Sequence, residues 1–490
     1  MLPSLDRSDP VMRRTPEWPG GPQPHTYPSG ALFEMRPPLR KLVVLADADL
    51  LAAPDDPTLN PTVLLTGLLT HPYIKLLRYR DAGPPADAPR KGDTAEGWAE
   101  LLPPDDQEGR GLVYAYASEQ PVWTGLYGTR AEYARGDTSP IAYRDRGDEA
   151  AADQREHDAL AAEIAMAVNV DLFVTERPYL FETRWPVAQG VTLCPIAKAL
   201  AVVSLYLRSQ NEFLLWHAAD GSGKLMTNEW LYYQIGAVEL LPELGRWSSA
   251  RTQMKSEDDK EALSGLHDAL LQRVQRSIRT RDGFYRAYNL PQKRDAVRTM
   301  LVELDTLLVL LMGAVDASAR FIHTLLGLPA DDKHQAGWQR EGWRKKIAKE
   351  NATLADLFRP NTPLADTLII LARLRNTVHG EMIRATMRQS VRSRDAAIRL
   401  PHEDGQKVLE AMGALGGREA WGVRTNADGA EVVDPGLFVE LLFPKVLTLL
   451  NAVMEHTPGG AGAGPRPPGQ GPRWYNERNR RSIRWQLGFE

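Results

Sequence analysis

Three residues with chemically useful side chains lie close together in the segment LARLRNTVHG. They are Arg375, Asn376 and His379. A histidine with a pKa near neutrality can take the proton of a ribose 2′-hydroxyl or give one to a leaving oxygen. A neighbouring guanidinium can bind a phosphate with two hydrogen bonds and stabilise the charge that develops on it in the transition state. The asparagine amide could hold the imidazole or a phosphate oxygen. Side chains of these types can cleave RNA without a metal ion.

The same segment has the apolar spacing of a helix, which we expect to run from Leu364 to about Gln389. Apolar residues at intervals of three or four form one stripe, which consists of Leu364, Leu368, Leu371, Leu374, Val378 and Met382. At about 100° per residue, Arg375 and His379 lie at the margin of this stripe, whereas Arg373 points away from it. The structural alternative is a histidine at a helix interface and an arginine paired with a carboxylate.

The motif LRNTVHG resembles the signature of the HEPN superfamily, whose members are helical bundles and in many cases metal-independent endoribonucleases. Arg375 matches the family's Arg-Asn context, and Arg373 matches its usual spacing from the histidine. Helix geometry favours Arg375 as the partner of His379, and Arg373 stays as the alternative catalytic arginine. The resemblance covers roughly residues 285–457. It implies an RNA substrate, no cofactor and a homodimer, because the family's active groove usually forms between two bundles.

The first half of the chain has the pattern of an α/β domain. KLVVLADADLL (Lys41–Leu51) and VDLFVTE (Val170–Glu176) contain the short apolar runs of strands buried on both faces. Between them, DALAAEIAMAV (Asp158–Val168) is rich in alanine and predicts a helix. The charged stretches around residues 82–110 and 134–150, broken by Pro and Gly, indicate loops. This order predicts a domain with a parallel sheet over roughly residues 39–186.

Three acidic residues are expected to meet at one edge of this domain. Asp47 ends the first strand, Asp158 begins the helix and Glu176 ends the later strand. Strand ends and helix starts lie on the same edge of a parallel sheet, and clustered carboxylates bind Mg²⁺ or Mn²⁺. The pattern resembles the PIN-like nuclease fold, which implies these three residues as metal ligands. Asp49 and Asp153 are competing assignments, and capping or turn chemistry explains acids at such positions equally well.

The rest of the chain divides by composition. Residues 1–38 are rich in Pro and Gly and indicate an irregular arm, and residues 187–284 predict a helical connecting region. The HEPN-like part over 285–457 contains a predicted hairpin at WGVRTNADGAEVV (Trp421–Val433). Residues 458–490 begin as a flexible linker rich in Pro and Gly.

The chain ends in a basic and aromatic tail, RWYNERNRRSIRWQLGF. Arginines can hold phosphates while aromatic rings stack on unpaired bases, so this mixture suits single-stranded RNA. The alternative is a terminal segment whose aromatic rings pack on the body of the protein. The candidate RNA-binding residues are Arg473, Trp474, Arg478, Arg480, Arg481, Arg484 and Trp485.

The composition of the chain limits the kinds of binding site and the classes of protein that are compatible with it. The 490 residues carry 59 basic and 63 acidic side chains, so a net charge of −4 provides no general attraction to nucleic acid, and RNA binding depends on local patches. Cys194 is the single cysteine, which excludes a disulfide framework and fits a reducing cytoplasm. No long apolar stretch free of charge predicts a membrane span.

These observations favour an endoribonuclease with metal-independent Arg/His chemistry in a HEPN-like dimer. The combination of domains resembles bacterial toxin and antiviral defence effectors, and this implies a regulatory trigger or an inhibitor. The first alternative is a metal-dependent PIN-like nuclease that uses Asp47, Asp158 and Glu176. The second is a scaffold that binds RNA or a partner without catalysis.

Overall fold

The computed structural model divides the chain into Met1–Pro38 and Leu39–Glu490. The first unit, which includes the predicted arm, lies outside the described residues, and the second is described here by itself. The described residues are 41–489 with gaps at 52–59, 87–95, 103–111, 116–121, 126–151, 182–190, 219–222, 290–293, 381–382, 390–393, 401–403, 427 and 459–476.

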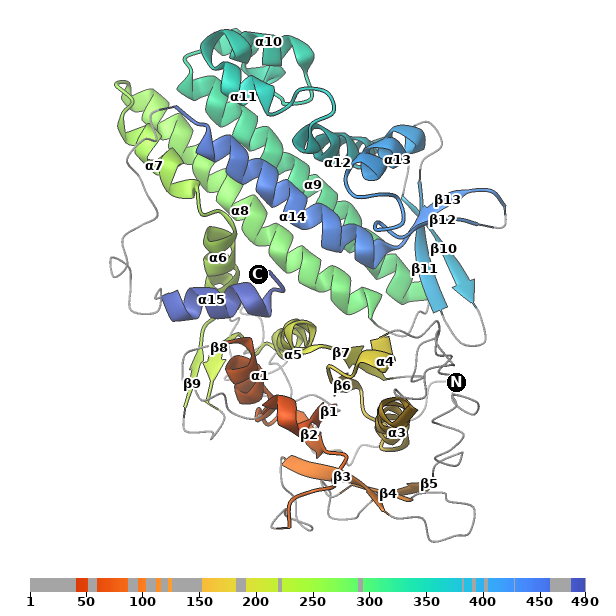
Figure 1. The fold of residues 1–490 in the computed structure, drawn as a ribbon. Helices are drawn as coiled ribbons and strands as arrows, with labels where there is room; N and C mark the ends of the chain where they lie inside the picture. Colours follow the sequence, from red (N-terminus) through yellow and green to blue (C-terminus); the bar gives the residue numbers. More distant parts are fainter. Residues whose placement is uncertain are drawn as a thin grey trace, which may run out of the picture. The chain divides into compact units, whose positions relative to one another are not determined.

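A seven-stranded sheet forms the centre of the α/β part (Figure 1). Its order is β5-β4-β3-β2-β1-β6-β7; strands β3, β2, β1, β6 and β7 are parallel, and β4 and β5 are antiparallel. The predicted α/β class with a parallel sheet is therefore confirmed. The strands are β1 Leu42–Asp47, β2 Ile74–Tyr79, β3 Glu96–Leu102, β4 Leu112–Ala115, β5 Val122–Gly125, β6 Leu172–Val174 and β7 Thr192–Cys194.

Helices cover both faces of this sheet. Successive side chains of a strand point to opposite faces, so Leu45 of β1 packs in the cluster that contains α3 (Ala152–Ala167). Its neighbours Val44 and Ala46 pack in the cluster that contains α1 (Pro61–Leu69) and α5 (Ile196–Ser209). Burial on both faces explains why β1 is a continuous apolar run. The short helices of this part are η2 Ala48–Leu51 and α4 Pro178–Phe181.

Two expectations for this part need correction. The sheet extends beyond residue 186, because β7 pairs with β6 and α5 packs on the sheet. The stretch predicted as loops up to residue 110 contains β3, and the one at 134–150 lies outside the described residues. Within the region predicted as helical, α5 ends at Ser209 because Asn211 adopts a positive φ of 65°. The hairpin of β8 (Leu214–His217) and β9 (Lys224–Met226) follows.

The second half is mainly helical, as predicted, and shares one large apolar core. The two longest helices, α8 and α9, pack along each other, and α12 and α14 pack on α9 (Figure 1). The helices are α6 Glu229–Leu240, α7 Leu244–Thr252, α8 Glu257–Tyr288, α9 Arg294–Leu325, η4 Ala330–Gln335, α10 Glu341–Glu350, α11 Ala352–Asp356, α12 Pro363–Gly380, α13 Gly405–Ala414, α14 Pro435–Glu455 and α15 Glu477–Gln486.

A four-stranded antiparallel sheet lies after α12. Its order is β10-β11-β13-β12, with β10 Arg384–Gln389, β11 Arg394–Arg399, β12 Val423–Thr425 and β13 Glu431–Val433. Strands β12 and β13 form the predicted hairpin. The predicted helix from Leu364 to Gln389 is too long, because α12 ends at Gly380 and its last expected turns are β10.

Helix α14 is the single described helix whose length and apolar composition would suit a membrane crossing. Most of its apolar side chains are buried among the helices of the large core, for example Phe438, Leu442 and Val446. Such burial is typical of the core helix of a globular protein.

Candidate functional site

The apolar stripe of α12 anchors the helix in the core, as the sequence predicts. Leu368, Leu371 and Leu374 are at most 5% exposed, and Leu364 and Val378 pack against the same cluster. The last member of the stripe, Met382, lies outside the described residues. Because one side of α12 is fixed in this way, the polar residues of its margin have defined positions.

The two candidate arginines of α12 have different environments. Arg373 donates a hydrogen bond from Nη1 to Oδ1 of Asp404 over 2.8 Å, which ties α12 to the start of α13. Arg375 is half-buried and donates from Nη1 to Oδ1 of Asn376 over 3.3 Å. Its Nε is buried and has no hydrogen-bond partner among the described residues. Arg375 therefore has one buried donor, Nε, that no described residue satisfies.

Helix α9 places an acidic residue beside Arg375. Burial raises the pKa of the Asp316 carboxyl, and the positive charges of Arg375, Arg320 and Arg273 oppose this rise, together with a hydrogen bond to Gln339. Asp316 is not among the residues that the sequence predicts for this site. Residue spacing within α12 contains no information on α9, which is adjacent only in the folded chain.

His379 lies in the last turn of α12. The separation of four residues from Arg375 is close to one helical turn of 3.6 residues, which places the two residues on the same side of the helix. The side chain of His379 lies outside the described residues, so the helix defines its position but not its contacts.

The acidic edge of the sheet is organised around an arginine. Strand order reverses at β1, so the carboxyl ends of β1 and β6 form the switch point where ligands bind in open α/β sheets. Asp47 ends β1, and Thr175 follows β6 and donates from Oγ1 to Oδ2 of Asp47 over 2.6 Å. Arg177 donates to Oδ1 of Asp47 from Nε and Nη2, over 3.1 and 3.0 Å.

The same guanidinium reaches two more carboxylates. Nη1 of Arg177 lies 3.5 Å from Oδ1 of the fully buried Asp158, and Nη2 lies 3.0 Å from Oδ1 of Asp81. Burial raises the pKa of Asp158 and of Asp47. Burial would also raise the pKa of Asp81, but the hydrogen bond and charge of Arg177 outweigh it and lower that pKa. Arg177 and Asp81 are not among the residues that the sequence predicts for this edge.

The arrangement does not fit the Mg²⁺ or Mn²⁺ ion that the PIN-like resemblance implies. Arg177 already provides the positive charge between Asp47 and Asp158. Glu176 is exposed and accepts a hydrogen bond from the backbone N–H of Ile196 over 3.0 Å, at the first turn of α5. In the part of the chain that the structure describes, no group of three or more His, Cys, Asp or Glu side chains could hold a metal ion.

Asp49 and Asp153, the other acidic candidates for the predicted metal site, lie in different elements. Asp49 lies in η2 and pairs with Arg80 over 2.9 Å. Asp153 lies in the first turn of α3, and its side chain is outside the described residues.

The described part of the basic tail forms helix α15, which packs on α5 and α6 of the body of the protein. Arg480 forms an ion pair with Glu239 of α6, and Arg478 lies over the ring of Trp216, 5.4 Å from its centroid. Trp485 packs against the apolar cluster under α1 and α5. Arg481 pairs with Glu477 within α15 over 2.8 Å, and Arg484 is exposed. The other two candidates, Arg473 and Trp474, lie outside the described residues.

Comparison with protein-family models, curated proteins and solved structures finds no match to this chain. The site on α12 and the edge of the sheet are therefore judged by their own geometry.

Proposed function

We propose that this chain is an intracellular endoribonuclease that cuts RNA with Arg375, Asn376 and His379, without a metal ion, in a HEPN-like helical domain. The observation that carries this proposal is the difference between the two arginines of α12. Arg373 is held by Asp404, whereas Arg375 keeps a buried Nε without a partner, one turn from His379. A guanidinium with an unsatisfied donor beside a histidine suits metal-independent phosphodiester cleavage.

In the proposed reaction, His379 takes the proton of the ribose 2′-hydroxyl. The resulting alkoxide attacks the adjacent phosphorus and the bond to the 5′-oxygen breaks. This leaving oxygen takes a proton from the protonated His379 or from water. Arg375 stabilises the phosphate as it gains charge, and Asn376 accepts a hydrogen bond from Arg375 and orients it. Asp316 holds the guanidinium from the side of α9 through its charge. The products are a 2′,3′-cyclic phosphate and a 5′-hydroxyl.

The N-terminal domain receives a different role. Arg177 forms ion pairs with Asp47, Asp81 and Asp158. We therefore assign the PIN-like sheet to sensing a regulatory trigger or to binding RNA rather than to metal-dependent cleavage. An RNase that acts on its host's RNA needs such control, in keeping with a toxin or antiviral effector. Assembly as a homodimer would form the groove in which RNA meets His379.

The test is cleavage of a mixed RNA pool by the wild type, His379→Ala and Asp47→Asn, each in EDTA and in Mn²⁺. We expect the wild type and Asp47→Asn to cut in EDTA and His379→Ala to lose roughly 10²–10⁴-fold in rate, the usual contribution of general acid–base catalysis. Cleavage that requires Mn²⁺ and disappears in Asp47→Asn would instead place the reaction at the sheet edge.

A further inference from the structure

A cavity of about 370 Å³ lies where α5, α8, α14 and the residues after α15 meet. Its size is within the range of small-molecule sites. Most of its wall is apolar, with Leu200, Ala201 and Val202 from α5, and Leu487 and Phe489 from the end of the chain. Val202 is 36% exposed at its margin, so the cavity is open to solvent.

A buried arginine without an acidic partner among the described residues also lines this wall, beside the Arg208–Asp282 pair and the exposed Lys198 and Glu440. Arg281 of α8 is 9% exposed and forms no ion pair with a carboxylate of the described residues. It donates from Nη1 to the backbone oxygen of Leu487 over 2.8 Å, and its guanidinium lies 4.6 Å from the ring centroid of Phe489. Its Nε is buried without a hydrogen-bond partner among the described residues.

Neither of the two acidic residues of this wall, Asp282 and Glu440, forms an ion pair with Arg281. Asp282 accepts hydrogen bonds from Nε and Nη2 of Arg208 over 2.6 and 3.0 Å, and from the hydroxyl of Tyr233 over 2.8 Å. Glu440 is exposed, as is Lys198, and these two opposite charges both line the cavity. A buried cation without a counter-charge is costly, so an anion at Arg281 would be stabilising.

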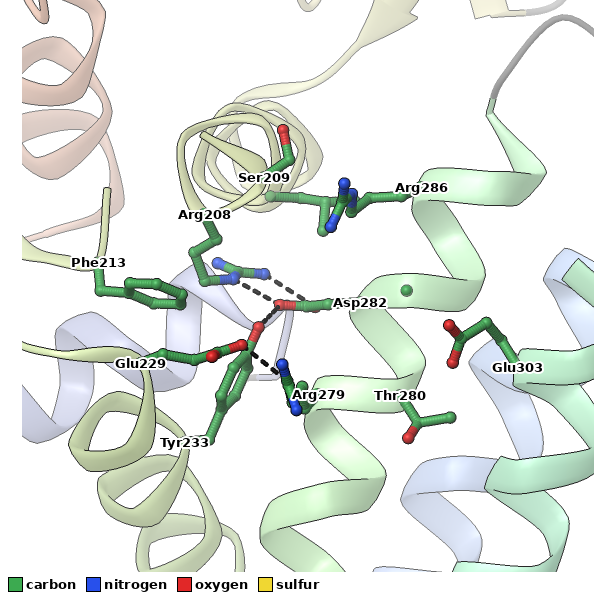
Figure 2. A pocket seen from close by; sticks show the side chains of 12 residues that line it. Arg208, Ser209, Phe213, Glu229, Tyr233, Arg279, Thr280, Asp282, Arg286 and Glu303 are labelled. Carbon is green, nitrogen blue, oxygen red and sulfur yellow. Dashed lines mark hydrogen bonds and ion pairs between the residues drawn. The ribbon is translucent and has the colours of Figure 1, made fainter. Parts of the chain in front are cut away.

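A second cavity, of about 340 Å³, shares Leu205, Arg208 and Asp282 with the first but differs from it in the pairing of its charges (Figure 2). Its cations already have acidic neighbours. Arg279 pairs with Glu229 over 2.7 Å, and Arg279 and Arg286 both act on the carboxyl of Glu303. A cavity with balanced charges does not select an anion, whereas the apolar cavity at Arg281 does.

We propose that the cavity at Arg281 binds a small organic anion with an apolar body, such as a medium-chain carboxylate. The carboxylate pairs with Arg281, and the apolar body lies against Leu200, Val202 and Leu487. Because the ligand contacts α5 of the α/β part and α8 and α14 of the helical part, it stabilises the junction between them. This site is independent of the proposed RNase chemistry on α12.

The test measures binding to the full chain by calorimetry and thermal unfolding, with octanoate as the probe. Octanamide has the same apolar body without the charge, and acetate has the charge without the body. We expect octanoate to bind and to raise Tm, and both controls to bind at least tenfold more weakly. Equal binding of octanoate and octanamide, or no binding of octanoate, would overturn the proposal.

Two variants at exposed valines locate the site without disturbing the core. Val202→Asp places a negative charge at the margin of the cavity and is expected to weaken octanoate binding at least tenfold. Val309→Asp introduces the same charge on an exposed valine of α9 that does not line the cavity, and binding should stay within twofold of the wild type. An equal effect of the two variants would contradict this location.

Discussion

Arg373 and Asp404 form an ion pair of 2.8 Å between α12 and the residue before α13. This contact distinguishes the two candidate catalytic arginines, Arg373 and Arg375, which the motif alone does not. It assigns Arg373 to holding two elements together, and it leaves Arg375 as the guanidinium with an unsatisfied donor. The chemistry proposed for α12 follows from this division.

Replacing each arginine by glutamine should therefore give different results. Arg375→Gln removes the charge that stabilises the phosphate, and we expect cleavage of a labelled RNA to fall by about 10²–10³-fold. Arg373→Gln breaks a partly exposed ion pair, so it should keep activity within a few-fold and lose about 0–1 kcal/mol of stability. The reverse ranking of the two rates would show that Arg373 is the working arginine.

Removing Arg177 should destabilise the α/β part. Arg177→Met leaves Asp47 and Asp158 without their cation, which typically costs about 3–5 kcal/mol. The loss should shrink as the pH falls, because carboxyls whose pKa is raised by burial become neutral early. Denaturant unfolding at two pH values measures both effects.

Lys345→Met is the matched control for this experiment, since it breaks an exposed ion pair with Glu341 and should change stability by less than about 0.5 kcal/mol. An Arg177→Met protein as stable as the control at neutral pH would contradict the role of Arg177 as the internal cation.

Glu163 provides a pH-dependent prediction. It is 8% exposed on α3, and burial raises its pKa from 4.5 to about 7. The folded protein then binds more protons than the unfolded chain between these values, so this group lowers stability progressively as the pH rises from about 4.5 to 7. At roughly 1.4 kcal/mol per unit, the cost above pH 7 is about 3 kcal/mol.

The variant Glu163→Gln removes this penalty. It should be more stable than the wild type at pH 8 and no more stable at pH 4, when both are followed by denaturant unfolding. A pH-independent difference between the two proteins would show that Glu163 is not buried as a neutral acid.

The docked tail predicts a stability effect for Trp485. Because this ring packs on the cluster under α1 and α5, Trp485→Ala should lose roughly 2–3 kcal/mol, while Arg484→Ala on the exposed face should change stability by less than about 0.5 kcal/mol. Thermal unfolding compares them. Unchanged stability in Trp485→Ala together with weaker RNA binding would support the alternative in which the tail stacks on bases.

The sequence predicts those features that depend on local patterns. The apolar run of β1 and the stripe of α12 indicate their burial, and Asp47 is expected at the carboxyl edge of the sheet. The end of α12 could not be predicted, because the apolar spacing continues to Met382 while the chain forms β10 shortly afterwards.

The partners that charged residues find in the folded chain could not be predicted from the sequence either. Arg177 follows β6 by a few residues, and nothing local indicates that it joins Asp47 at the end of β1 and Asp81 after β2, both far from it in the sequence. Asp316 likewise meets Arg375 only because α9 packs against α12. Composition alone leaves open whether the basic tail binds RNA or packs on the body of the protein, whereas in the structure α15 pairs with Glu239 on α6.

The central claim is that His379 transfers the proton in metal-free RNA cleavage. The most direct measurement is the rate and the product ends of RNA cut in EDTA by the wild type, by His379→Ala, and by His334→Ala, which changes an exposed histidine of η4. The account predicts 2′,3′-cyclic phosphate ends from the wild type and His334→Ala, and a loss of roughly 10²–10⁴-fold in His379→Ala. Equal cleavage by all three proteins, or no cleavage by a folded wild type, would contradict it.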